Sequence, residues 1–461
     1  MQDALPLDIL DDVIADRIRD IDSYRKHNGD FTRKRMLDAE TAVKVTLNMA
    51  GGALGDELIY AFPDADDRMS VSAYIQAKNK LCPELFQDIL TGYNKALDHA
   101  EKLTKALDYR LFAIDGTDFH PPYQSRSKYA MQTPPGRPRK DGKPVKPCSM
   151  VHANMLYDIR NRLFEDCILQ PKADTDERKA AVEMLKVLDC GNYIAIMDRG
   201  YSCFWILETL NRLKGQGCHY VIRTKSGKKA IKEIAALPDR ECDVDMEFHV
   251  TTSQRYYQRH KTEDPKLHYV PHIKNHYKEV LAKSTKDRFW DKEDYCVIKC
   301  RVVKFLISEP ESGEERWEVL FTNLNRFEFP LSSMKDLYHE RWGIETAFLQ
   351  LKYAVKAIQF HSRKDDFIDM EIYSNLIVYN ATAGMVAKAH IPQGKGNKYV
   401  YKVNFTRAVT IFRKYFRLFN KTPYWKMLSE ISMYRIPDIP GRSDERNLKP
   451  KSAIWYTYRV G

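Results

Sequence analysis

The chain has 461 residues, of which 43% are hydrophobic and 30% are charged, and it carries a formal net charge of +11. This length exceeds one ordinary core, so we expect two or three domains, and the hydrophobic content excludes wholesale disorder. No run approaches the roughly 18 uninterrupted apolar residues of a membrane-spanning helix, and the acidic start MQDALPLDILDDVIAD is unlike a secretory signal. We therefore expect a cytoplasmic protein without a membrane partner.

The first 108 residues are predicted to form a helical domain. Apolar side chains recur on one stripe of the first helix: Leu7, Leu10, Ile14, Ile18 and Ile21. The segment SVSAYIQAKNKLCPELFQDIL predicts a helix, a short break and a second helix that begins near Pro83. Two short helices that meet at a break occur in many DNA-reading modules, and equally in any helical bundle.

The pattern changes near residue 110, where short apolar or alternating runs are followed by turn residues. Five strands are predicted, at RLFAIDGT, MVHANMLYDI, LFEDCILQP, YIAIMDRGY and CHYVIRTK. Helical patterns separate the later runs, at DERKAAVEMLKVL and CFWILETLNRLKG. Residues 109–225 are therefore predicted to form a mixed sheet flanked by helices, which is an α/β fold.

Residues 226–325 interrupt this pattern with alternating stretches such as CDVDMEFHV, and with the hairpin candidate VIKCRVVKFLISE–PESG–EERWEVLFTNL. We interpret them as a β-rich insertion. In residues 326–385 the α/β core resumes with one long helix, from about Ser332 to Phe360, for which Ser332 or Ser333 is the expected N-cap.

The last segment, residues 386–461, is basic. It holds 16 Lys and Arg against four Asp and Glu, a local net charge of +12, whereas the rest of the chain is near neutral. Aromatic residues alternate with the basic ones, as in TIFRKYFRLFNKTPYWK, a composition that suits binding to a phosphate backbone. The alternative is a solvated basic helix face.

The cysteines and histidines give little indication of a zinc site. The nine cysteines contain no CxxC pair and mostly lie in apolar runs, which favours reduced core thiols. His268, His272 and His276 recur every four residues, but Pro271 argues against the helix on which that spacing would bind a metal.

Two carboxylates follow predicted strands: Asp115 ends the run LFAID, and Asp198 ends the run YIAIMD. A carboxylate at the end of a buried strand points into the crevice beyond the carboxyl edge of the sheet. Aspartate is also a common turn former, so either residue alone is more often structural. Two such residues on strands expected to be neighbours favour a shared site.

A third acid lies on the predicted long helix, in LYHERWGIETAFLQLK. At about 100° per residue, Tyr338, Arg341, Glu345 and Lys352 fall within roughly 60° of one helix face. An acid, two bases and a tyrosine on one narrow stripe are not a core-packing pattern. The alternative is an exposed ion-paired face, because Arg341 and Glu345 have i,i+4 spacing.

The spacing Tyr–x2–Arg–x3–Glu–x6–Lys resembles the signature of the insertion-sequence-four family of DDE transposases, and the contexts DGT at Asp115 and DRG at Asp198 are also similar to that family. The order of the predicted parts resembles the family as well. The resemblance implies an RNase H-like core with a β-rich insertion, a helical N-terminal DNA-end-binding domain and a basic helical C-terminal region.

The resemblance also implies the roles of the site residues. Asp115, Asp198 and Glu345 would be the catalytic residues and the ligands of two Mg²⁺ ions, with Asp115 bridging both ions and Mn²⁺ tolerated in their place. Hard cations prefer such oxygen ligands. The DNA-binding residues implied are Arg341, Lys352, Tyr338 and Arg199, which would contact phosphates, and Trp317, which would stack on a base flipped out of the duplex.

The implied reaction is cut-and-paste transposition of insertion-sequence ends through a DNA hairpin. Its partners would be double-stranded DNA and a second copy of the chain in the synaptic complex, at the bacterial nucleoid. Two alternatives stay open from the residues themselves. One is an RNase H-like metal-dependent nuclease without strand transfer, and the other is a non-catalytic DNA-binding regulator, against which the three intact acids argue.

Overall fold

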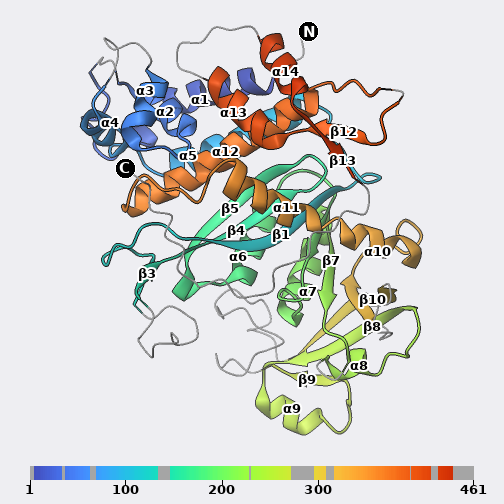
Figure 1. Ribbon diagram of the computed structural model, residues 1–461. Coiled ribbons are helices and arrows are strands. Elements are labelled where there is room, and N and C mark those ends of the chain that lie inside the picture. The colour runs from blue at the N-terminus through green and yellow to red at the C-terminus, as the bar shows by residue number, and fades with distance from the viewer. Residues whose placement is uncertain are drawn as a thin grey trace.

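The computed structural model describes residues 5–33, 37–62, 69–132, 146–227, 230–270, 295–307, 316–394, 396–416 and 424–439. Within these ranges a mixed sheet of nine strands runs through the molecule in the order β5-β4-β1-β6-β7-β11-β10-β8-β9 (Figure 1). The strands are β1 (Arg110–Phe119), β4 (Val151–Asp158), β5 (Leu163–Pro171), β6 (Tyr193–Met197), β7 (Cys218–Thr224), β8 (Cys242–Thr251), β9 (Leu267–Tyr269), β10 (Cys296–Ile307) and β11 (Arg316–Thr322).

The first five of these strands form an RNase H-like core. β4 pairs antiparallel with both β5 and β1, whereas β6 lies parallel to β1, and β7 lies parallel to β6. The parallel strands are reached through helices α6 (Glu177–Val187) and α7 (Phe204–Arg212), because a parallel pair requires a crossover connection. The five strands and two helices predicted for residues 109–225 are confirmed.

The predicted β-rich segment continues the same sheet. β11 pairs antiparallel with β7, β10 with β11, and β8 with β10, so the strands after β7 extend the core sheet sideways. The predicted hairpin is present as β10 and β11, and its connection, residues 308–315, lies outside the described residues. Short helices α8 (Lys232–Ala235) and α9 (Gln254–His260) accompany these strands.

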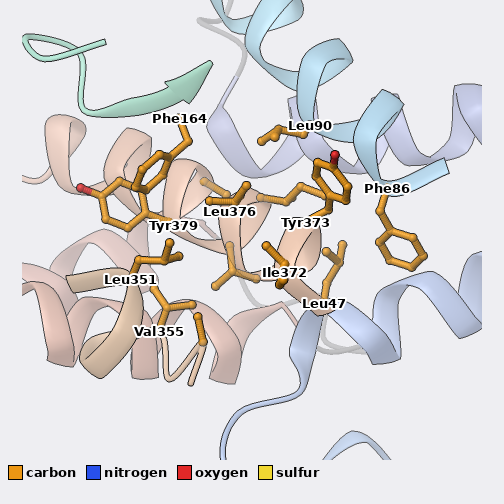
Figure 2. Close-up of a cluster of buried hydrophobic side chains, with 14 of the residues drawn as sticks. Leu47, Phe86, Leu90, Phe164, Leu351, Val355, Ile372, Tyr373, Leu376 and Tyr379 are labelled. Carbon is orange, nitrogen blue, oxygen red and sulfur yellow. The ribbon is translucent and has the colours of Figure 1, made fainter. Parts of the chain in front are cut away.

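Helices cover both faces of the core sheet. α6 and α7 pack on one face against side chains such as Phe112 and Ile114 of β1. The other face is covered by helices from the beginning, the middle and the end of the chain, which share one apolar cluster (Figures 1 and 2). They are α1 (Pro6–Arg19), α2 (Ala39–Asn48), α5 (Glu84–Ala100), α11 (Trp342–Leu349), α12 (Asp365–Lys388) and α13 (Phe405–Tyr415).

Helix α12 is the centre of that cluster. Figure 2 shows its Ile372, Tyr373, Leu376 and Tyr379 among side chains from α2, α5 and β5. Of its 24 residues, 17 are buried, so it is a core helix enclosed by protein. No helix in the described ranges combines the length and the apolar content that a bilayer crossing needs.

The N-terminal helices follow the predicted pattern. In α1, Leu10 and Ile14 are fully buried, and Leu7 and Ile18, with Ile21 just after the helix, pack against the same core. α4 (Val71–Lys78) and α5 are separated by a break, and Pro83 is the N-cap of α5. α3 (Leu54–Ala61) completes this helical region.

The prediction of a single helix from Ser332 to Phe360 is wrong. The structure has α10 (Leu331–His339), capped by Pro330, then α11, and then a π-helical turn, Gln350–Ala354. Between the two helices the backbone N–H groups of Arg341, Gly343 and Ile344 donate to carbonyls three residues back, which tightens the turn. Gly343 also lies against β4 and the loop after it: a Cβ there would meet Ile159 at 3.0 Å.

The described part of the basic C-terminal region is mainly helical, as predicted. α13 and α14 (Tyr424–Met433) pack against α12, and β12 (Val400–Val403) pairs with β13 (Arg435–Asp438). Not every basic residue there faces solvent. The Arg413 guanidinium is buried and donates to the carbonyl of Val355 at 3.1 Å, and burial lowers its pKa to about 10. A small sheet of β2 (Ala130–Met131) and β3 (Cys148–Ser149) lies in the loop after β1.

Candidate active site

Asp115 and Asp198 lie side by side where the parallel pairing of β1 and β6 ends. The last paired residues are Ile114 and Met197, and the two aspartates are the residues that follow. Asp198 comes directly after its strand, as predicted. Asp115 is not the end of its strand, because β1 continues to Phe119 on the β4 side. Asp115 is nevertheless at a sheet edge, since its β6 neighbour has stopped.

Glu345 reaches the same place from helix α11, through Arg341. The Arg341 guanidinium lies 3.3 Å from Asp115 Oδ2, and it donates to Glu345 Oε1 at 2.8 Å. Arg341 is only 5% exposed, and its Nε has no hydrogen-bond partner in the described part of the chain. One buried cation therefore joins a carboxylate of the sheet to a carboxylate of the helix.

Asp115 is held in an environment that disfavours its charge. Burial raises the pKa of this carboxyl to about 6, and the nearby carboxylates of Asp198 and Glu177 contribute to the increase. The backbone N–H of Gly116, which donates to Asp115 Oδ1 at 2.9 Å, and the Arg341 guanidinium act in the opposite direction. A carboxylate in this state gains from any further cation.

Lys352 lies on the same side of β1, on the π-helical turn. Its ammonium donates to Thr117 Oγ1 at 2.6 Å and lies 5.4 Å from the centre of the Phe119 ring. Burial lowers the pKa of Lys352, although nearby Asp118 opposes the shift. The π-helical turn thus places the Lys352 ammonium against Thr117, two residues after Asp115 in β1.

Tyr338 is buried behind the carboxylates. Its ring lies 5.7 Å from the Arg223 guanidinium, and its hydroxyl has no hydrogen-bond partner in the described ranges. Burial raises the pKa of Tyr338 to about 12. A buried hydroxyl without a partner costs about 1–3 kcal/mol, so it is a group that would gain from a bound phosphate oxygen.

The structure does not bring Trp317 to the carboxylates. In β11, Trp317 shares a face with Val319 and Phe321, which pack with α7, whereas Glu318 on the other face contacts Arg223 at 3.3 Å. Trp317 is half-buried beneath the Lys304 ammonium, which lies 4.8 Å from its ring.

Arg199 is exposed directly after Asp198. It borders a small pocket at the start of α7, together with Ser202, Thr224 and Lys225. Arg199 is therefore beside the carboxylates but turned toward solvent. Of the three histidines, His268 is paired with Glu233 at 2.9 Å, and His272 and His276 lie outside the described residues.

The carboxylates suit divalent cations. Asp115 and Glu345 already converge on one cation, Arg341, and all three acids offer the oxygen ligands that Mg²⁺ prefers. Within the described residues, no three His, Cys, Asp or Glu side chains are close enough to enclose an ion as they stand. The Arg341 guanidinium lies between Asp115 and Glu345.

Several polar residues near the proposed ligands had no signal in the sequence. They are His152, Glu177, Tyr201 and Arg223. Thr117 belongs to the DGT motif, and the periodicity of β1 places it on the Asp115 face. The others come from separate strands, a helix start and a turn, and only the fold brings them together.

A comparison with family models identifies the family of this chain. A family model described as "Transposase DDE domain" matches residues 106–381. Among solved structures, the chain is similar to a cryo-EM structure of the piggyBac transposase synaptic complex with hairpin DNA. The sequence identity is 15%, 96% of this chain and 87% of that chain are covered, and the TM-score is 0.40. No curated protein sequence matches. The family match spans more than half of the residues and includes all three acids, so the chain belongs to the transposase DDE domain family.

Proposed function

We propose that this protein is a DNA transposase of the insertion-sequence-four type, which cuts and rejoins the ends of its element with the help of two Mg²⁺ ions. The observation that carries the proposal is that Arg341, which is buried, contacts both Asp115 and Glu345, while Asp198 follows the strand paired with the Asp115 strand and the half-buried Lys352 contacts Thr117. Carboxylates from a sheet edge and from a helix form a metal-ligand set, and the cations beside them suit the phosphates of a DNA backbone.

In this proposal Asp115, Asp198 and Glu345 would hold the metal ions, with Asp115 as the central ligand. Bound divalent cations would act as Lewis acids on the scissile phosphate and would lower the pKa of the attacking water. The raised pKa of Asp115 supports its place at the centre, because a carboxylate destabilised by burial gains the most from a cation.

Arg341 would change partners during the reaction. Without metal it neutralises Asp115 and Glu345, and it lies where an ion would have to enter. Once cations neutralise the two acids, the guanidinium would be available to a phosphate that flanks the scissile bond. Lys352 and the Tyr338 hydroxyl would contact the same stretch of backbone.

The fuller cycle is also part of the proposal. Hydrolysis would nick one strand, the freed 3′-hydroxyl would attack the opposite strand to form a hairpin, and the reopened end would join target DNA. Two copies of the chain would hold the two ends. Trp317 would stack on a flipped base during the hairpin step, and because it lies on the other sheet face, the DNA would have to pass around β11.

The test uses purified full-length protein and labelled duplexes that contain the DNA flanking its own coding sequence. We expect nicking in Mg²⁺ or Mn²⁺, and complete loss of nicking in Asp115→Asn, Asp198→Asn and Glu345→Gln. Binding to the duplex should persist, because basic groups provide most of the affinity for DNA. A matched control is Asp336→Asn, which removes an exposed carboxylate from α10 and should cleave normally.

The outcomes separate the competing functions. A wild-type rate in any one of the three variants would refute the assignment of that acid. Supplying pre-cut ends with a target plasmid distinguishes a transposase, which joins them, from a nuclease, which leaves the target intact. Specific binding to the ends without cleavage in any divalent metal would indicate a DNA-binding regulator.

A further inference from the structure

A fourth carboxylate, that of Glu177, lies near Asp115. Glu177 is the first residue of α6, and its Oε1 lies 3.4 Å from the position that a Cβ would take at Gly116, the residue after Asp115. Its charge contributes to the raised pKa of Asp115. Glu177 therefore approaches the catalytic strand from the α6 side, while Arg341 approaches from the α11 side.

A buried histidine lies against Glu177. His152 is 2% exposed, and its Nε2 lies 3.1 Å from Glu177 Oε1. Its Nδ1 lies 2.6 Å from Asp118 Oδ1, and the Lys172 ammonium pairs with the same Asp118 oxygen at 2.9 Å. The imidazole thus connects Glu177 to the end of β1.

The charges in this chain of contacts keep Glu177 ionised. The contact with His152 lowers the pKa of Glu177, although burial opposes the shift. Burial also acts against a charged His152, but Asp118 and Glu177 outweigh it, so the pKa of the imidazole is raised. Near neutral pH, Glu177 is therefore a carboxylate anion, the form that binds a cation.

The backbone leaves room for this arrangement only because residue 116 is glycine. A Cβ at Gly116 would lie 2.3 Å from His152 Nε2, a distance that no real contact allows. The glycine of the DGT motif is thus needed for the close approach of His152 and Glu177 to the strand that carries Asp115.

An unpartnered hydroxyl lies at the same place. Tyr201 is 1% exposed, and its hydroxyl has no hydrogen-bond partner in the described residues. Burial raises its pKa, and the charges of Glu177, Asp115 and Asp198 raise it further. A buried hydroxyl without a partner is a group that a bound water or other ligand would satisfy.

Glu177 is not explained by the needs of its helix. Acidic residues are favoured in a first turn, but the cap of α6 is Asp176, whose side chain accepts the Lys179 N–H at 3.1 Å. The Glu177 carboxylate is directed instead toward Gly116 and His152.

We propose that Glu177 is a fourth carboxylate of the metal centre, which gives an oxygen ligand, directly or through a bound water, to a divalent cation held by Asp115 and Asp198. His152 is then a positioning residue that holds Glu177 in place, and the Tyr201 hydroxyl donates a hydrogen bond to the same shell. The inference rests on the proposed function, because it assigns a further ligand to that site.

The test measures Mn²⁺ binding to the full-length chain without DNA, by electron paramagnetic resonance of free Mn²⁺. We expect Glu177→Gln, which preserves the shape of the side chain, to weaken Mn²⁺ binding about 10- to 100-fold. The matched control is Glu183→Gln on the same helix, whose carboxylate pairs with Lys179 at 3.6 Å and should bind Mn²⁺ like the wild type. Unfolding temperatures in EDTA show whether each variant is folded.

Asp115→Asn separates failure of this inference from failure of the proposed function. If Asp115→Asn loses Mn²⁺ affinity but Glu177→Gln does not, the fourth ligand is refuted and the metal centre stands. If neither variant changes Mn²⁺ binding, the metal centre itself is refuted.

Tyr201→Phe gives a second reading that does not depend on how well Glu177→Gln folds. It removes a hydroxyl that has no partner among the described residues, so the unfolding temperature in EDTA should not fall, whereas Mn²⁺ affinity should fall several-fold. Unchanged Mn²⁺ affinity in Tyr201→Phe would refute the proposed hydrogen bond from the Tyr201 hydroxyl to the ligands of the metal ion.

Discussion

Replacing the central ligand should make the metal-free protein more stable. Asp115 is a buried carboxylate whose pKa is raised to about 6, first by burial and then by Asp198 and Glu177. A raised pKa means that the folded protein favours the neutral form of this group. Asp115→Asn installs a neutral side chain of nearly the same shape, so we expect it to abolish cleavage and yet to increase the free energy of unfolding.

The magnitude follows from the size of the shift. A rise from 3.8 to about 6 is roughly two pKa units, each worth 1.36 kcal/mol, which gives an upper limit of about 3 kcal/mol. The Arg341 contact to Asp115, which the variant loses as an ion pair, is already included in that shift. The side chain is also 29% exposed, so solvent reduces the effect, and we expect about 1–2 kcal/mol.

The pH dependence of the stability difference between Asp115→Asn and the wild type tests the sign of this effect. The folded pKa of Asp115 lies above its unfolded value of 3.8, so the ionised carboxylate destabilises the folded state. This destabilisation is complete above about pH 6, decreases between about 6 and 4, and is absent below 4. The advantage of Asp115→Asn should therefore be complete at pH 7.5 and close to zero at pH 4.

The assay is thermal unfolding in EDTA at pH 7.5 and at pH 4, repeated with Mg²⁺ at the higher pH. We expect the variant to unfold about 2–4 °C above the wild type at pH 7.5, and Mg²⁺ to stabilise only the wild type. Asp336→Asn, which removes an exposed charge, should unfold like the wild type. A variant less stable than the wild type at pH 7.5 would refute the reasoning, because Asp115 would then be a net stabilising ion-pair partner.

Three further predictions concern buried or partly buried side chains. Lys78→Met should lower the free energy of unfolding, measured with denaturant, by about 3–5 kcal/mol, because it leaves the Glu371 carboxylate, 3.1 Å away and 5% exposed, without its cation. A decrease below 1 kcal/mol would show that water reaches the pair. Tyr338→Phe should retain the unfolding temperature but slow nicking about tenfold, and normal nicking would mean that its hydroxyl never contacts DNA. Trp317→Ala should leave nicking unchanged and slow hairpin formation roughly 5- to 150-fold, if stacking contributes about 1–3 kcal/mol; equal slowing of both steps would identify a structural partner of Lys304.

Local periodicity determined most of the elements, and the resemblance of three short motifs to a known family indicated the proposed ligands. The strands of the core and the helices α6 and α7 were predictable, because apolar residues repeat with the period of each element over its whole length. Asp198 was predictable from the end of its strand. Arg341, Glu345 and Lys352 were predictable as neighbours from their spacing on one helix face, a pattern that survives the break before α11.

The tertiary structure decided which residues meet. Asp115 lies at an edge only because β6 stops one residue earlier in register, while β1 continues along β4. The register of β10 and β11 places Trp317 on the face away from the acids.

The residues that surround the proposed ligands likewise could not be predicted from local sequence patterns. His152, Glu177 and Tyr201 belong to a strand, a helix start and a turn, and no period links them. They converge because the pairing of β4 with β1 sets His152 opposite Asp118 and against Gly116, where no side chain is in the way. Periodicity along one segment predicts which of its side chains share a face. A site of this kind depends on which strands and helices pair with one another, and the sequence determines that pairing only through the packing of the whole chain.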